Sequence, residues 1–183
     1  MRVEVFTRNP PTEDSKYERA FGIANEIVTH LESTQISPIS NIATSKQIRD
    51  AVAEYMKKGS WIPDFKFNSS IPDSEPNTNY RIDFIKDIAE PSDKQIMRIL
   101  FEACFDNRQA IGTNVLKFEL ATRVFERHEN RKAIPIMLVA DKRSLKKYGW
   151  DGSIGSFEEY ELALRDPYSD LLSINPIFLV VRD

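Results

Sequence analysis

The sequence contains a single cysteine, Cys104, and only two histidines, His30 and His128. One thiol cannot form a disulfide within the chain, and one cysteine with two scattered histidines cannot supply the ligands of a structural zinc site. A nucleophilic cysteine would need a neighbouring base, and the residues around Cys104 include no histidine. These absences exclude disulfide scaffolds and zinc modules and predict a reducing, cytoplasmic setting.

Long apolar runs are absent too. No stretch approaches the roughly 18 apolar residues of a membrane-spanning helix, and the opening MRVEVFTRNPP lacks the basic and then apolar order of a signal peptide. We therefore expect a soluble protein that is not exported and has no membrane partner. An excess of positive charge is also missing, because the formal net charge is −3. Binding to DNA would need a local basic surface.

What remains has the composition of one globular domain over residues 1–183, with 41% hydrophobic and 29% charged residues. Hydrophobic periodicity predicts helices over 16–32, 45–58, 113–128 and 156–164, and strands over 2–6, 80–85, 98–105, 134–140 and 175–181. The polar residues 60–79 are typical of a long surface loop. This order of elements predicts an α/β fold in which helices flank a mixed sheet.

Two predicted strands each carry one carboxylate among apolar residues, Asp83 in RIDFI and Glu102 in ILFEACF. A charged group in an apolar strand is costly unless it is paired, solvated or bound to a metal. Two carboxylates on adjacent strands can converge on one Mg²⁺, which prefers oxygen ligands and keeps several waters. The metal would polarise a phosphodiester and lower the pKa of a bound water. Alternatively, each carboxylate pairs with a nearby cation such as Arg81, Lys86 or Arg98.

The segments RIDFIKD, FEACFDN and NVLKFELA, in this order, resemble the catalytic stretch of BglII-, BstYI- and BamHI-type restriction endonucleases of the PD-(D/E)xK superfamily. IPIMLVADKRSLKK and NPIFLVVRD are similar to later strands of the family, so the resemblance covers residues 80–183. It implies a restriction-endonuclease-like fold, with a mixed central β-sheet flanked by α-helices. It also implies a Mg²⁺-dependent type II endonuclease that acts as a homodimer on a short palindrome in double-stranded DNA.

The resemblance assigns roles to four positions in the two strands. It implies Asp83 and Glu102 as metal ligands, with the backbone carbonyl of Ala103 as a third. Cys104 stands where the family has Gln or Glu, and the wider superfamily Lys, to orient or activate the attacking water. A thiol is a poor hydrogen-bonding substitute and is not a ligand for hard cations. This departure suggests either that the enzyme is slow or inactive or that another group enters the site.

Two side chains on predicted helices are candidates for that group. Glu26 is preferred, because a helix carboxylate can approach the metal, whereas Lys117 could equally extend along the surface. The metal ligand itself also has rivals. Asp83 lies nineteen positions before Glu102, a long connection. Asp93 in the polar turn and Asp64 in WIPD are the weaker alternatives to Asp83.

Candidate DNA contacts fall in two segments. Lys142, Arg143, Lys146 and Lys147 form a basic run suited to phosphates. Asn68 and Asn77 in the 60–79 loop carry amides that can read base edges. A solvated surface is the alternative interpretation of both segments.

The leading hypothesis is therefore a metal-dependent endonuclease. The second is a catalytically impaired relative that binds DNA or a protein partner without cutting, which Cys104 and the acidic net charge support. The third is an unrelated α/β enzyme whose carboxylates are ion-paired.

Overall fold

The computed structural model describes residues 1–8, 14–34, 36, 41–67, 80–89, 95–150, 152–165 and 171–182. Within them one sheet contains β1 (Arg2–Thr7), β2 (Ile62–Lys66), β3 (Arg81–Ile88), β4 (Ile96–Ala103), β5 (Arg131–Ala140) and β6 (Ile177–Arg182). The helices are α1 (Ser15–Ser33), α2 (Asn41–Lys58), α3 (Ala110–His128), α4 (Lys142–Lys147) and α5 (Phe157–Arg165). The predicted α/β fold, a mixed sheet flanked by helices, is confirmed.

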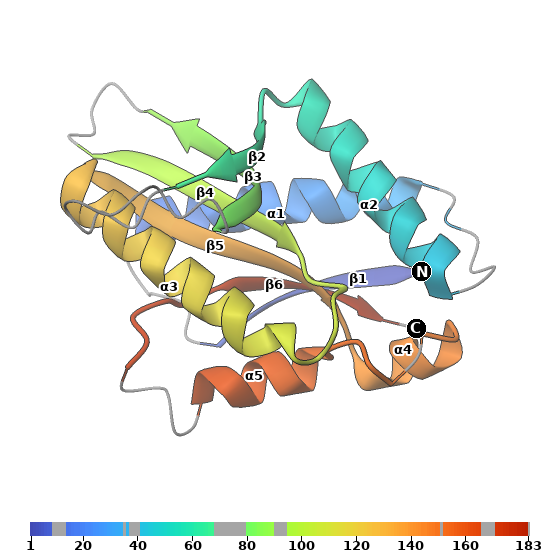
Figure 1. The fold of residues 1–183 in the computed structure, drawn as a ribbon. Coiled ribbons are helices and arrows are strands. Elements are labelled where there is room, and N and C mark those ends of the chain that lie inside the picture. Colours follow the sequence, from blue (N-terminus) through green and yellow to red (C-terminus); the bar gives the residue numbers. More distant parts are fainter. Residues whose placement is uncertain are drawn as a thin grey trace.

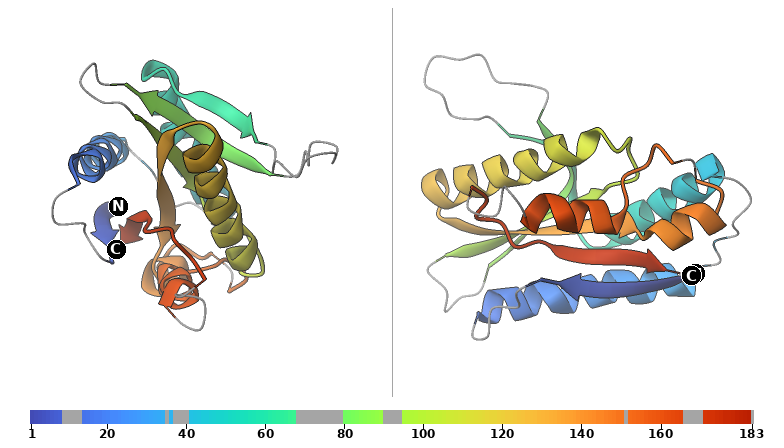
Figure 2. Two further views of the ribbon diagram at one scale, coloured as in Figure 1. Left: turned by 90° about the vertical axis from the view of Figure 1, so that its left-hand side faces the viewer. Right: turned by 90° about the horizontal axis from the view of Figure 1, so that it is seen from below.

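The strand order is β1-β6-β5-β4-β3-β2. Strands β4, β5 and β6 run parallel, and the other neighbours are antiparallel. Helices α1 and α2 pack on one face of the sheet and α3 and α5 on the other (Figures 1 and 2). The carboxyl ends of the three parallel strands therefore lie along one edge of the sheet. No helix in the described part of the chain is long and apolar enough to cross a membrane.

The sequence patterns predicted most of the helices and strands. The Asp14 side chain caps α1 by accepting from the backbone of Lys16 and Tyr17, and the helix buries Ala20, Ile23, Ile27 and Leu31 as its spacing predicted. Helices α2 and α3 begin earlier than predicted. Two elements were missed. Strand β2 contains Pro63 and is mostly exposed, so pairing with β3 rather than sequence pattern defines it. Helix α4 is too short to display a helical period.

A buried arginine ties β3 and β4 to the end of α3. Arg98, only 4% exposed, makes a two-pronged ion pair with Asp87, with distances of 2.6 and 2.8 Å. It also donates to Glu129 at 3.0 Å. The guanidinium carbon lies 4.4 Å from the ring centre of Phe125 and 5.3 Å from that of Phe65. This charge is therefore paired and enclosed by aromatic rings, as a buried cation must be.

We predict that Asp87→Ala lowers the free energy of unfolding by about 2–4 kcal/mol, because it leaves the buried Arg98 guanidinium short of a partner. Equilibrium urea unfolding measures the change. Glu54→Ala removes an exposed partner of Lys58 on α2 and serves as the control, with little expected effect. Equal unfolding midpoints for the two variants would contradict the role given to Arg98.

Candidate active site

Asp83 and Glu102 lie side by side at the open end of the β3–β4 hairpin. The ladder pairs Phe84 with Phe101, and continuing this register sets Asp83 opposite Glu102. The Asp83 amide donates to Glu102 Oε2 at 3.1 Å, and the Ala103 amide donates to Asp83 Oδ2 at 2.9 Å. Each carboxylate is thus oriented by the backbone of the other strand. The nineteen-residue spacing is explained, since both strands run the length of the hairpin.

Lys117 enters the site from α3. It is 8% exposed, and its Nζ donates to Glu102 Oε1 at 2.5 Å. The structure therefore brings Lys117, and not the preferred candidate Glu26, to the carboxylate pair. Glu26, on α1, accepts from the Tyr55 hydroxyl at 2.8 Å and does not line the cavity next to Asp83. The ion-pair alternative holds for Glu102, but its partner is Lys117, whereas Arg98 binds Asp87.

The two carboxylates are poorly solvated and repel one another. Burial raises the pKa of Asp83 above its usual value. Burial and, next, the charge of Asp83 raise the pKa of Glu102 to about 7, although Lys117 opposes the shift. A cation bound beside the two carboxylates would stabilise the pair, because its positive charge would offset both negative charges.

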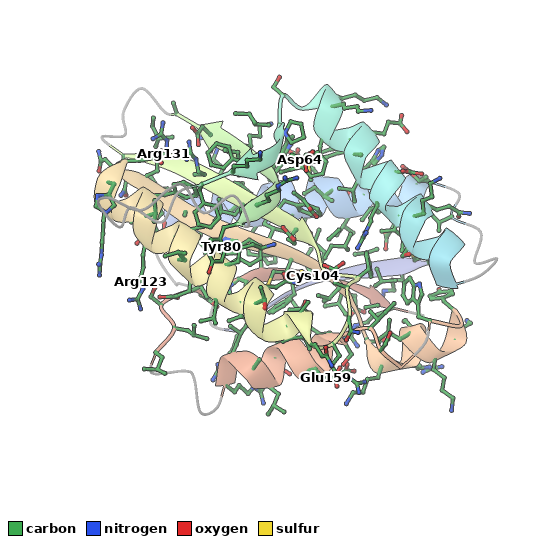
Figure 3. The ribbon with its side chains drawn as sticks, in the orientation of Figure 1. Asp64, Tyr80, Cys104, Arg123, Arg131 and Glu159 are labelled. Atoms are coloured by element: carbon green, nitrogen blue, oxygen red, sulfur yellow. The ribbon has the colours of Figure 1, made fainter. Side chains whose placement is uncertain are left out.

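A cavity of about 310 Å³ opens beside Asp83 and Glu102, between β3, β4 and α2. Asp64 of β2 lines it as well. The β2–β3 register pairs Pro63 with Phe84, which sets Asp64 opposite Asp83. Asp64 has a φ of 48°, an uncommon backbone conformation for a residue other than glycine, and such residues cluster at functional sites. Figure 3 labels Asp64 and, just past the end of β4, Cys104.

The side chains present fit a hard divalent cation. Asp83 and Glu102 supply oxygens from adjacent strands, and Ala103 lines the same cavity wall. Within the described residues no group of three or more His, Cys, Asp or Glu side chains is arranged to hold a metal. Two carboxylates are nevertheless a usual protein contribution for Mg²⁺, which retains several of its waters.

Cys104 is a fully buried free cysteine. Its side chain is 0% exposed, and its amide donates to the Leu138 carbonyl at 2.8 Å. Burial raises the pKa of the thiol well above its ordinary value, so a thiolate is disfavoured.

The predicted basic run forms α4, in which Lys142, Arg143, Lys146 and Lys147 are exposed. Asn68, Asn77 and Asp93 lie outside the described residues.

No protein-family model and no curated protein matches the sequence. A similar solved structure is that of restriction endonuclease BglII complexed with a DNA 16-mer. It has a TM-score of 0.58 and 13% sequence identity, and the match covers 100% of this chain and 78% of that one. The fold is restriction-endonuclease-like. In this fold the Asp83–Glu102 pair lies at the carboxyl end of β4, on the strands that the sequence resemblance had singled out.

We predict that divalent metal stabilises the protein more at pH 8 than at pH 6. With the pKa of Glu102 raised to about 7, the folded protein holds a proton that the unfolded chain has already lost. Without metal, stability therefore declines as the pH rises from about 4.5 towards 7, and metal competes with the proton there. Thermal unfolding with and without Mn²⁺ measures the difference. An equal shift at both pH values would contradict the assignment of Glu102 as a ligand.

Proposed function

We propose that this protein is a metal-dependent endonuclease that hydrolyses phosphodiester bonds in double-stranded DNA. One observation carries the proposal. Asp83 and Glu102 are held together, largely buried and beside a cavity, with the Lys117 ammonium bonded to Glu102, in a restriction-endonuclease-like fold. A carboxylate pair that exists only for stability would be an expensive feature, because burying it raises the pKa of both groups.

In the mechanism we propose, Asp83, Glu102 and the Ala103 carbonyl would hold Mg²⁺. The ion would supply charge neutralisation at the phosphodiester and make water more acidic. The backbone bonds between the strands keep both carboxylates oriented before DNA arrives. Lys117 holds Glu102 Oε1 and keeps a positive charge next to this carboxylate. It would thereby take the part that the family gives to the position of Cys104.

The direct test uses purified protein with unmethylated phage and plasmid DNA, in Mg²⁺, in Mn²⁺ and in EDTA. Discrete fragments are expected with either metal and none in EDTA. Sequencing the fragment ends would identify the cleavage site. Absence of cleavage with both metals, by a folded protein that still binds DNA, would favour the non-cutting DNA-binding protein over the endonuclease.

We further propose a homodimer acting at a short palindrome, as the family resemblance implies and as two-fold symmetry of protein and site would require. Two helices that pack together carry exposed leucines, Leu116 on α3 and Leu162 on α5, each 63% exposed. A second copy would bury such apolar surface. Light scattering should give twice the chain mass for the wild type, and a monomer mass at all concentrations would contradict the dimer.

Helix α4 is the proposed site of phosphate contacts. It follows β5, so it begins at the same edge of the sheet as the carboxyl end of β4, where Glu102 lies (Figure 1). We predict that replacing Lys142, Arg143 and Lys146 by alanine weakens DNA binding. The slope of log affinity against log salt should fall by about 0.9 for each phosphate that the variant no longer neutralises. Fluorescence anisotropy across a salt series measures the slope. An unchanged slope would exclude α4 as a phosphate-binding surface.

A further inference from the structure

The cavity beside Asp83 has an unfavourable charge for a nucleic acid. Its described lining includes five carboxylates, from Asp50, Asp64, Asp83, Glu102 and Asp106. A phosphodiester would be repelled here unless cations offset this charge. A divalent ion offsets part of it. Among the described lining residues the cationic side chain is that of Arg49, on α2.

Arg49 is held towards the cavity and keeps donors for a further partner. Its Nη2 lies 3.1 Å from Asp106 Oδ1, in the loop that follows β4, and both side chains are 47% exposed. A guanidinium carries five N–H donors in a rigid fork, so one bond to Asp106 leaves donors for a further anion. The fork matches the spacing of phosphate oxygens, which favours arginine over lysine for two-pronged contacts.

Lys117 cannot be the cation that binds a phosphate in the cavity. Its ammonium is buried and bonded to Glu102, and it does not line the cavity. Arg49 instead lines the cavity from α2, whereas the carboxylate pair lies on β3 and β4. A phosphate that enters this cavity would thus meet both the carboxylate pair and the guanidinium.

We infer that Arg49 binds a non-bridging oxygen of the DNA phosphate that enters this cavity, and that Asp106 orients its guanidinium before DNA arrives. The inference rests on the proposed function and adds a substrate-binding residue to it. The competing explanation is that the Arg49–Asp106 pair only ties α2 to the loop after β4. The two explanations differ in what happens when either partner is removed.

The test compares Arg49→Ala, Arg49→Lys and Asp106→Asn, with Arg165→Ala, an exposed arginine of α5 paired with Glu161, as the surface control. Cleavage is measured in Mg²⁺. DNA binding is measured by anisotropy in Ca²⁺, and Mn²⁺ binding and thermal unfolding verify the metal site and the fold. We expect Arg49→Ala to lower kcat/KM on the order of a hundredfold and to weaken DNA binding, with metal binding and melting unchanged. Arg49→Lys should recover part of the loss.

Asp106→Asn breaks the same ion pair but keeps the guanidinium. We therefore expect the fold-loss in kcat/KM for Asp106→Asn to be less than a tenth of the fold-loss for Arg49→Ala. Equal effects in the two variants, or a lower melting temperature in both, would overturn the inference in favour of the structural tie. Full cleavage and full DNA binding by Arg49→Ala would overturn the inference about Arg49 and leave the proposed function standing. If the wild type does not cut but binds DNA, weaker binding by Arg49→Ala still supports the inference. A wild type that neither cuts nor binds DNA overturns both.

Discussion

Asp83→Asn is expected to lower the rate of DNA cleavage on the order of a thousandfold or more, while the protein remains folded and at least as stable as the wild type. The drop in rate follows because an amide is a weak metal ligand, and metal assistance contributes several kcal/mol to phosphodiester hydrolysis. Stability should not fall, because asparagine can still accept the Ala103 amide that Asp83 now accepts.

The sign of the stability change follows from the pKa of Asp83. Burial raises this pKa, so the folded protein disfavours the charged carboxylate, and above pH 3.8 the charge costs stability. A neutral amide removes this cost at pH 8, and it removes the repulsion of Glu102. Single-turnover cleavage and urea unfolding measure the two effects, with Glu54→Gln on α2 as the matched surface control. Cleavage within tenfold of the wild type would rule Asp83 out as an essential ligand.

Lys117→Met should lower cleavage by a hundredfold or more, whereas Cys104→Ala should leave it within a few-fold of the wild type. The lysine ammonium is bonded to Glu102, and removing one positioned charged donor from a catalytic site costs about 10²–10³ in rate. The thiol is fully buried, so its replacement by alanine mainly leaves a small cavity that costs about 1 kcal/mol of stability.

The contrast between these variants decides whether the departure at Cys104 impairs the protein. Cleavage rates at saturating DNA, with melting temperatures to verify the fold, make the comparison. If Lys117→Met cuts normally, the lysine is a structural partner of Glu102 and another group activates water. If Cys104→Ala abolishes cleavage in a protein that melts like the wild type, the thiol acts in the site despite its burial.

The two proposed ligand positions were open to sequence reasoning because each places a carboxylate in an apolar strand. A carboxylate in RIDFI or ILFEACF needs a partner or a metal, and the hairpin that joins these strands brings the two together. Lys117 was ranked below Glu26 because a lysine beside a phenylalanine on a helix can equally extend to solvent. The helical periodicity did indicate that Lys117 points inward, because Asn114, Lys117 and Ala121 share one face of α3 and are all buried.

The positions of Asp64, a weaker alternative ligand in the sequence, and of Arg49 at the cavity could not be predicted from sequence for a different reason. Strand β2 has no alternating pattern, so the register that sets Asp64 opposite Asp83 arises only from pairing with β3. Arg49 lies on α2, and its position at the cavity depends on how that helix packs across the end of the hairpin. Contacts between elements distant in the sequence carry no local signal, and charged helix residues are usually solvated.

The most direct test of the account is the number of Mn²⁺ ions bound per chain at pH 8, measured by electron paramagnetic resonance in the wild type and in Asp83→Asn. We predict that the wild type binds Mn²⁺ at this site, that Mg²⁺ competes for it, and that Asp83→Asn does not bind it while remaining folded. Equal Mn²⁺ binding by both proteins, or none by a folded wild type, would contradict the claim that Asp83 and Glu102 form a divalent-cation site.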